Sequence, residues 1–250
     1  KAMAKECAER KMNLVLVALP GPELAEYAAH LELTYNIKVF YFPIDLSHKN
    51  GTKQLYEWCV SKRLPVNVLI NNAGLGHVGT FEGSTVDFYQ SMMQLNMQTL
   101  VTLTQLFIPE LKKHSTSYIL NVGSASALHP VPYKCVYSAT KSFVLYFSKA
   151  LRAELKNTQV IVSCVCPGVV MTNKEVRETI NSAGRLGRLT RMSAEEVAHI
   201  AIKGLLKKKA IIIPGKFNKM LLFTAKFIPD AFIAALFGSF FRNLLKQDKA

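Results

Sequence analysis

Three side chains in the middle of the chain have the types and the spacing of a proton-transfer site. Tyr137 and Lys141 stand four residues apart in the run Tyr-Ser-Ala-Thr-Lys. The segment 136–152 has helical periodicity, so both side chains are expected on one helix face. Ser124 ends the apolar run Ile-Leu-Asn-Val-Gly-Ser that begins at Ile119, which predicts a strand. A serine at a strand end, opposite a helical tyrosine and lysine, is suited to act on a carbonyl oxygen.

The chemistry of such a trio depends on the charge of the lysine. A phenol with a pKa near ten is a weak acid and a weak base at neutral pH. A cation within a few ångströms lowers that pKa, and Lys141 can supply the charge. Tyr137 would then give a proton to a carbonyl oxygen or take one from an alcohol, while the Ser124 hydroxyl holds the same oxygen. None of the three donates hydride, so a redox reaction requires a bound cofactor. The alternative is structural, because Tyr-x-x-x-Lys also occurs where a lysine lies along a tyrosine ring.

Four further segments, in order along the chain, favour the chemical interpretation. Asn71-Asn72-Ala73-Gly74 follows the apolar run Val66–Ile70, and Asn96 lies within a long helical segment. Pro167-Gly168-Val169-Val170-Met171-Thr172 follows a strand predicted at 160–166, and Asp45 ends a strand predicted at 37–46. With the serine, tyrosine and lysine, these segments resemble the short-chain dehydrogenase/reductase family from Lys1 to about Pro214.

This resemblance implies a role for each matched residue. Tyr137 would be the general acid/base, Lys141 would lower its pKa and hold the nicotinamide ribose, and Ser124 would orient the substrate oxygen. Asn96 would anchor a water molecule in a proton relay to Lys141, and a hydrogen-bonded structural asparagine is the alternative. Asp45 would lie near the adenine, and the loop after 160–166 would lie on the nicotinamide side. The full set of implied dinucleotide-binding residues is Asp45, Asn72, Ala73, Gly74, Tyr137, Lys141, Pro167, Gly168, Val170 and Thr172.

Helical and strand patterns alternate along the chain. Helices are predicted at 1–10, 22–33, 51–62, 85–113, 136–156 and 193–208, and strands at 13–19, 37–46, 66–70, 118–122, 160–166 and 210–213. Ser84 with Asp87, and Ser193 with Glu196, have the spacing of capping boxes. The alternation predicts one α/β domain over residues 1–215, with a Rossmann-like, doubly wound parallel sheet and helices on both faces.

The glycine-rich turn that cradles a pyrophosphate in dinucleotide-binding folds, and the strand before it, are missing from the sequence, which opens with Lys1-Ala2-Met3-Ala4. That strand is central in the family's sheet, so we expect a split sheet with unpaired inner edges. Either the sequence omits a segment that the parent protein has, or the chain is a relative that never binds cofactor. We favour the first account. An intact mass near 27.9 kDa for the purified protein would contradict it.

The choice between NAD and NADP depends on the residue after the second strand of the fold. An acid there binds the ribose of NAD, and an arginine accommodates the 2′-phosphate of NADP. The run 17–22 is Val-Ala-Leu-Pro-Gly-Pro, which contains neither. The missing acid and a net charge of +14 favour NADP, and NAD stays open.

Composition argues against several other classes of protein. The basic residues are scattered and do not interleave with aromatic residues, so nucleic-acid binding is not predicted. Among five cysteines, Cys164 and Cys166 share a face of a predicted buried strand, which favours core packing over a metal site or a disulfide. That pattern indicates a reducing, cytoplasmic compartment. No apolar run is long enough to span a bilayer.

The loop between Ser124 and Tyr137 is mostly apolar and predicts a lipophilic ketone or alcohol as substrate, such as a 3-oxoacyl chain or a steroid. His129 in this loop, and His77, are interpreted as solvated loop residues and not as substrate ligands.

The arginines of segment 174–191 would contact the phosphates of an acyl carrier, or would simply be solvated. Reduction of small carbonyls and a non-catalytic dinucleotide sensor are the alternative functions.

Residues 216–250 differ in character from the rest of the chain. An amphipathic stretch is followed, after Pro229, by a very apolar one, which predicts a helical tail. An exposed apolar surface of this kind is typical of an interaction site. Three uses are open: packing within a homodimer or homotetramer, covering the substrate mouth, or lying in a membrane interface with the lysines at the headgroups. The residues concerned are Lys216, Lys219 and Lys226, then Phe232, Ile233, Leu236, Phe237, Phe240, Phe241 and Leu244.

Overall fold

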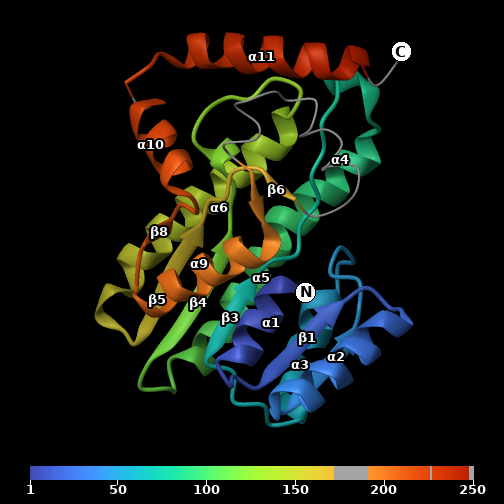
Figure 1. The fold of residues 1–250 in the computed structure, drawn as a ribbon. Helices are drawn as coiled ribbons and strands as arrows, with labels where there is room; N and C mark the ends of the chain where they lie inside the picture. Colours follow the sequence, from blue (N-terminus) through green and yellow to red (C-terminus); the bar gives the residue numbers. More distant parts are fainter. Residues whose placement is uncertain (172–190, 226, 248–250) are drawn as a thin grey trace.

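The computed structural model of the chain describes residues 1–171, 191–225 and 227–247. Parallel strands lie between two layers of helices (Figure 1). The chain therefore has the Rossmann-like, doubly wound α/β fold that its sequence predicts. Its strands are β1 (Leu14–Ala18), β2 (Val39–Pro43), β3 (Val68–Asn71), β4 (Ser117–Val122), β5 (Val160–Val165), β6 (Val170–Met171), β7 (Met192–Ser193) and β8 (Ile211–Ile212).

The sheet is in two parts. β1 pairs with β2, with Leu14 opposite Val39, and the larger part has the order β3-β4-β5-β8. All of these pairs are parallel. Within the described residues, β1 and β3 therefore each have one edge without a partner strand. This confirms the expected split between the strands predicted at 13–19 and 66–70.

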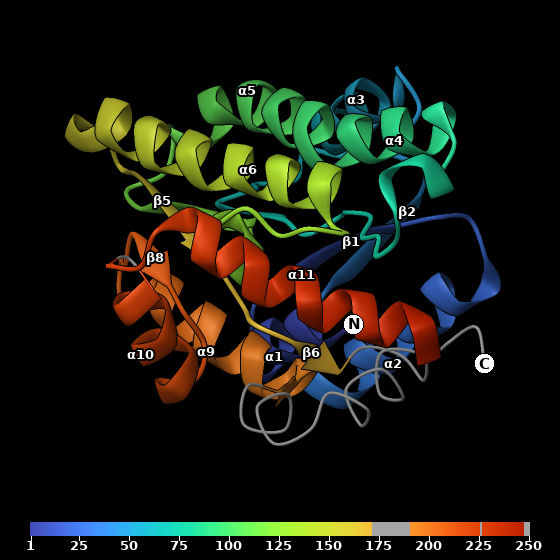
Figure 2. The same ribbon diagram turned by 90° about the horizontal axis from the view of Figure 1, so that it is seen from above.

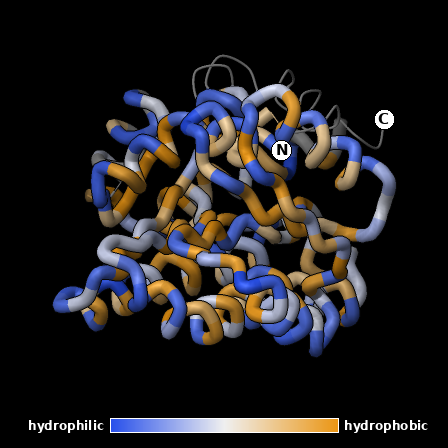
Figure 3. Tube along the Cα trace, turned by 90° about the horizontal axis from the view of Figure 1, so that it is seen from below, coloured by the Kyte–Doolittle hydropathy of each residue, from blue (hydrophilic) through white to orange (hydrophobic). Residues whose placement is uncertain are grey.

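Helices cover both faces of the sheet (Figure 2). On one face, α3 (Gly51–Ser61), α5 (Thr99–Leu111) and α6 (Cys135–Glu154) pack around Ile119 of β4. On the other face, α1 (Ala2–Glu9) and α9 (Ala194–Leu206) pack around Leu120. Ile119 and Leu120 thus pack into the cores on opposite faces of the sheet, because successive side chains of a strand point to opposite faces. Figure 3 shows hydrophobic and hydrophilic residues alternating along the outer helices, as expected for helices with one buried face.

The long helix predicted at 85–113 is wrong in detail. The segment consists of α4 (Val86–Met93), a π-helical turn at Gln94–Gln98, and α5. The capping box predicted for Ser84 is also wrong, because Thr85 is the N-cap residue and accepts a hydrogen bond from the Phe88 amide. The strand predicted at 37–46 is shorter, since β2 ends at Pro43. The Ile44 amide still donates to the Ala18 carbonyl of β1 at 2.8 Å, one residue past the end of β2.

Other helix starts are as predicted. Ser193 and Glu196 form a capping box at the start of α9, with the Glu196 amide donating to the Ser193 hydroxyl at 3.1 Å. α2 (Pro22–Tyr35) begins with its proline in the first turn, where no amide hydrogen is needed. Both signals fix where a helix follows the carboxyl end of a strand.

The tail forms two helices, α10 (Lys216–Ala225) and α11 (Asp230–Gln247). α11 lies across the top of the molecule in Figure 1, over the loop that precedes α6. Phe237 and Phe241 of α11 pack against Val131 of that loop. In the described part of the chain, no helix has both the length and the hydropathy that crossing a bilayer requires.

Candidate active site

Ser124 is fixed by the turn that follows β4. It is the N-cap residue of a short 3-10 helix, Ala125–Ala127, and its hydroxyl oxygen accepts a hydrogen bond from the Ser126 amide at 3.2 Å. The two serine hydroxyls are 2.6 Å apart. The Ala125 amide donates to the Pro167 carbonyl, which ties this turn to the loop after β5. The Ser124 side chain is buried. It lies just beyond the carboxyl end of β4, and ligands of open α/β sheets bind outside the carboxyl ends of the strands.

Tyr137 and Lys141 occupy the first turns of α6, on the face that covers the sheet. The Lys141 ammonium lies 5.8 Å from the centre of the Tyr137 ring. It also donates a hydrogen bond of 2.8 Å to the Val122 carbonyl at the end of β4, two residues before Ser124. The structure thus brings together all three residues on which the sequence-based hypothesis rests.

The pKa of Tyr137 differs from the sequence-based expectation. Burial raises the pKa of this phenol, and its hydrogen bond with Ser124 only partly offsets that rise. A lowered pKa was expected from Lys141, but the lysine faces the Val122 carbonyl and burial dominates. Tyr137 is therefore protonated at neutral pH, which is the form that a proton donor to a carbonyl oxygen needs.

Lys141 is nearly enclosed, with 5% of its surface exposed. Burial lowers the pKa of its ammonium to about 8, and the thiols of Cys164 and Cys166 act in the opposite direction. Both cysteines are fully buried on one face of β5 and the residue after it, and their sulfurs are 3.7 Å apart. Core packing was the sequence-based interpretation. The sequence did not reveal that both thiols are close enough to Lys141 to influence its pKa.

The backbone between Ser124 and β4 passes close to these two sulfurs. A Cβ atom on Gly123 would lie 2.9 Å from the Cys164 sulfur and 3.2 Å from that of Cys166. We expect Gly123→Ala to destabilise the fold by about 1–3 kcal/mol, because the buried core has no room for a methyl group. Gly238→Ala is the matched control, since its nearest atom is 3.6 Å away on Pro132. Equal melting temperatures for the two variants would contradict this prediction.

Asn96 holds two elements together from within the π-helical turn. Its side-chain oxygen accepts from the Leu75 amide at 2.8 Å, and its side-chain nitrogen donates to the Leu75 carbonyl and to Thr140 of α6. A Cβ on Gly74 would lie 3.0 Å from this oxygen and 3.4 Å from the Lys141 nitrogen. Asn96 is therefore placed beside the lysine, at a π-helical turn of the kind that is frequent at functional sites.

The implied dinucleotide-binding residues follow three strands. Asn72, Ala73 and Gly74 come directly after β3 and are exposed, and Pro167 and Gly168 come after β5. They lie at the same sheet edge as Ser124, because the strands are parallel. Val170 begins β6, and Thr172 lies outside the described residues.

Asp45 follows β2, in the smaller part of the sheet. Its carboxylate accepts hydrogen bonds from the Ser47 hydroxyl at 2.7 Å and from the Ser47 amide at 2.8 Å. These bonds hold the pKa of Asp45 below its ordinary value, so it is ionised. The local turn thus already uses one of its two carboxylate oxygens. A contact between Asp45 and the adenine of a bound dinucleotide therefore stays a prediction.

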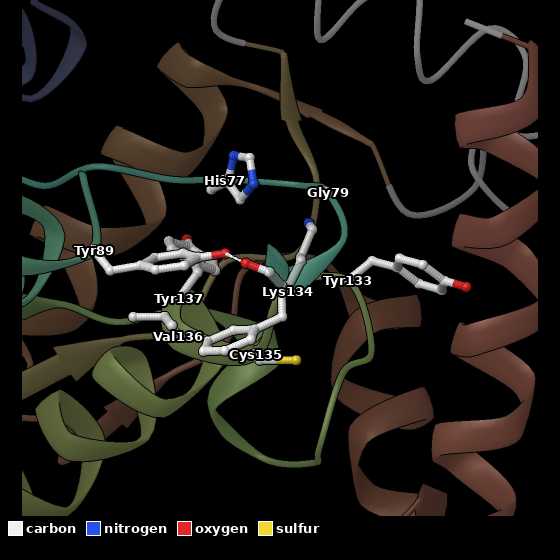
Figure 4. A pocket seen from close by; sticks show the side chains of 9 residues that line it. His77, Gly79, Tyr89, Tyr133, Lys134, Cys135, Val136 and Tyr137 are labelled. Atoms are coloured by element: carbon white, nitrogen blue, oxygen red, sulfur yellow. Dashed lines mark hydrogen bonds between the residues drawn. The ribbon is translucent and has the colours of Figure 1, made fainter. Parts of the chain in front are cut away.

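Two adjoining hollows open beside Tyr137. The inner one, of about 10 Å³, lies between Tyr137, His77 and Lys134, with room for about one water molecule (Figure 4). The outer one is a groove of about 450 Å³ between the loops at Phe81 and Tyr133 on one side and α11 on the other. Its volume is in the range of small-molecule sites. α11 therefore forms one wall of the groove, which shares Phe81, Tyr133 and Cys135 with the inner hollow.

The two loop histidines have protein partners, in contrast to the solvated state that the sequence suggested. His129 lies 3.1 Å from the Asp230 carboxylate at the start of α11, with 10% of its side chain exposed. His77 is half-buried, and its Nε2 lies 2.8 Å from the Ser84 hydroxyl. Asp230 is remote from His129 in sequence, and Ser84 lies in a loop. No local sequence pattern therefore predicts either contact.

The chain belongs to the short-chain dehydrogenase family: the family described as short chain dehydrogenase matches residues 1–183. It is therefore a member of an oxidoreductase family.

Similar curated proteins include a 3-oxoacyl-CoA reductase and a hydroxysteroid dehydrogenase. The very-long-chain 3-oxoacyl-CoA reductase-B of Danio rerio is 33% identical over 178 residues, which are 69% of this chain and 56% of the relative. The 17-beta-hydroxysteroid dehydrogenase type 3 of Homo sapiens is 32% identical over 174 residues, with the same coverage of 69% and 56%. The chain thus spans just over half the length of these relatives.

Solved structures of the same fold hold either cofactor. A short-chain dehydrogenase from Sphingobium yanoikuyae in complex with NADPH is 27% identical, with a TM-score of 0.75 and coverage of 99% of this chain and 90% of that one. One from Burkholderia phymatum in complex with NAD is 21% identical, with a TM-score of 0.75 and coverage of 88% and 86%. The second likeness bears on the fold alone.

Proposed function

We propose that this protein is an NADP-dependent oxidoreductase that interconverts a ketone and a secondary alcohol on a lipophilic substrate. One observation carries the proposal: Ser124, Tyr137 and Lys141 meet at the carboxyl edge of the sheet, where the half-buried, protonated Tyr137 lines a small hollow that shares residues with a larger groove. A structural Tyr-x-x-x-Lys pair would need neither the strand-end serine nor the adjoining space.

Each residue of the site would have a separate role in carbonyl reduction. The hydroxyl groups of Ser124 and Tyr137 would both donate hydrogen bonds to the substrate oxygen, which orients the carbonyl and stabilises the negative charge that develops on it. Tyr137 then transfers its proton to that oxygen. The buried Lys141 ammonium stabilises the phenolate that remains, and Asn96 holds the neighbouring loop in place. Lys141 and the loop after β5 would hold NADPH at this edge, and the cofactor would supply the hydride.

The shape and lining of the approach favour a lipophilic substrate. The groove is bounded by Phe81 and Tyr133 on one side and by Ala234, Ala235 and Gly238 of α11 on the other. These small and aromatic residues offer contacts along an extended chain or a flat ring system, while Glu82 and Arg242 make part of the same groove polar. Relatives named as a 3-oxoacyl-CoA reductase and a hydroxysteroid dehydrogenase support the same two substrate classes, 3-oxoacyl and steroid.

The preference for NADP rests on charge. β1 ends at Ala18, and the residues that follow it are Leu19, Pro20 and Gly21, so no carboxylate stands there to bind the ribose of NAD. A net charge of +14 favours the more anionic dinucleotide.

Consumption of reduced cofactor by the whole protein tests this proposal. We expect oxidation of NADPH that depends on added carbonyl, over a panel of 3-oxoacyl thioesters, keto-steroids and small ketones. The value of kcat/KM should be higher with NADPH than with NADH. A preference for NADH would reverse the cofactor assignment. Binding of either cofactor without turnover of any carbonyl would instead indicate a dinucleotide sensor.

We also propose that the outer side of α11 rests on an anionic membrane surface. Phe232, Leu236 and Phe240 recur every fourth residue and are 65%, 59% and 39% exposed, so they form one apolar row. The neighbouring α10 exposes Lys216 and Lys219. An apolar row next to cations is the arrangement of an interfacial helix, and the positive charge of the chain complements anionic lipids.

Replacing Phe232, Leu236 and Phe240 together by serine should reduce partitioning onto phosphatidylserine vesicles by about tenfold or more. Leu33→Ser combined with Val60→Ser is the matched control, because both side chains are exposed on other helices. Equal partitioning of the two variants and the wild type would exclude this role for the row. A dimer that the row variant dissociates in light scattering would assign the row to a second copy of the chain instead.

A further inference from the structure

Lys134 is a cation in the inner hollow that the proposed reaction does not use. It immediately precedes α6, three residues before Tyr137, and its side chain lines the same small space as His77 and Gly79. Figure 4 shows the side chains of Lys134 and Tyr89 converging on this space, while Tyr133 points away toward α11.

The side chain of Lys134 is packed between two aromatic rings. Its nitrogen lies 4.9 Å from the centre of the Phe241 ring on α11 and 6.0 Å from the centre of the Tyr137 ring. Ring faces attract a cation but do not accept its three hydrogen bonds as oxygen atoms do. The rings therefore hold the lysine in position without satisfying its donors.

No carboxylate in the described part of the chain pairs with Lys134, and no described oxygen accepts a hydrogen bond from its nitrogen. Burial lowers the pKa of this ammonium. A half-buried cation of this kind gains from any oxygen acceptor that enters the hollow. The position of that acceptor is restricted, because the space beside Tyr137 is small.

We propose that Lys134 binds a second acceptor oxygen of the substrate, next to the carbonyl on which Tyr137 acts, and so selects 3-oxoacyl compounds over simple ketones. This inference rests on the proposed function and deepens it. In a 3-oxoacyl thioester the thioester oxygen is separated from the reacting carbonyl carbon by a single methylene and the thioester carbon. The hollow beside Lys134 has room for about one such oxygen, and the methylene spacer lets the reacting carbonyl lie at Tyr137. A lone keto group on an apolar skeleton leaves the lysine donors unsatisfied.

The test compares two substrates of equal chain length in the wild type and in Lys134→Met. One is a 3-oxoacyl thioester of N-acetylcysteamine, which has no phosphate, and the other is the matching methyl ketone. A charge-assisted hydrogen bond corresponds to a factor of about 10–100 in kcat/KM. We expect Lys134→Met to lose roughly that factor on the thioester and less than about threefold on the ketone. Lys134→Arg should keep most of the thioester activity.

Lys149→Met is the matched control, because Lys149 also lies over a tyrosine ring, that of Tyr146, but is exposed and outside the hollow. It should leave the substrate ratio unchanged. Equal losses of Lys134→Met on both substrates, or no loss on either, would overturn the inference. If the wild type reduces the ketone but not the thioester, this inference alone fails. If it reduces no carbonyl at all, the proposed function fails with it.

Discussion

A Tyr137→Phe variant is expected to lose the carbonyl-dependent oxidation of NADPH by about 10²–10⁴-fold, the range that a positioned general acid contributes. The substitution removes one oxygen atom from a half-buried ring and leaves the ring in place. The burial that raises the pKa of this phenol keeps it protonated, which is the state that the proposed proton donor requires. Ser124 remains in the variant and can orient the carbonyl, but its hydroxyl is a much weaker acid.

Tyr146→Phe is the control for this measurement, since Tyr146 lies on the same helix with 66% of its surface exposed. It should retain wild-type turnover. Binding of NADPH, followed by its fluorescence, should weaken only modestly in Tyr137→Phe, because the other implied dinucleotide-binding residues remain. A variant that turns over as fast as the wild type would remove Tyr137 from the mechanism. Protonation of the substrate oxygen would then need another acid.

The second large effect is expected at Lys141. Lys141→Met should reduce kcat/KM by roughly 10²-fold or more, because the variant loses the cation that stabilises the phenolate left by proton transfer. In the wild type, kcat/KM for reduction should fall as the pH rises through about 8, where the ammonium loses its proton. The direction follows from burial, which lowers the pKa of the lysine from 10.5, while the pKa of Tyr137 moves upward.

Lys141→Arg separates this titration from other causes of an alkaline decline. A guanidinium keeps its charge throughout the working range, so whatever activity remains should lack the decline near pH 8. An unchanged decline in the arginine variant would assign it to another group. A wild-type profile that stays flat to pH 10 would contradict the lowered pKa itself.

The buried strands and the trio were predictable because each has a strong local signal. The run 160–166 differs from β5 by one residue, since an apolar segment buried on both faces has few other conformations. The spacing of Tyr137 and Lys141 fixes their common face on any helix, and Ser124 stands at the end of β4 as the apolar run requires.

Other features depend on contacts that no short segment encodes. The π-helical turn at Gln94–Gln98 has the composition of an ordinary helix, so only its packing around Asn96 distinguishes it. The raised pKa of Tyr137 depends on the burial of its ring, and the position of Lys134 depends on Phe241, far along the chain. The same holds for His129, whose partner Asp230 is 101 residues away.

The transfer of deuterium tests the central claim most directly. The whole protein is incubated with NADPH deuterated at the reactive position of the nicotinamide and with a 3-oxoacyl thioester or a keto-steroid, and the product is analysed by mass spectrometry. The proposed mechanism predicts an alcohol that carries one deuterium with the wild type and with Tyr146→Phe, and none above the blank with Tyr137→Phe. No deuterated alcohol from any carbonyl with the wild type, or equal amounts with Tyr137→Phe, would contradict it.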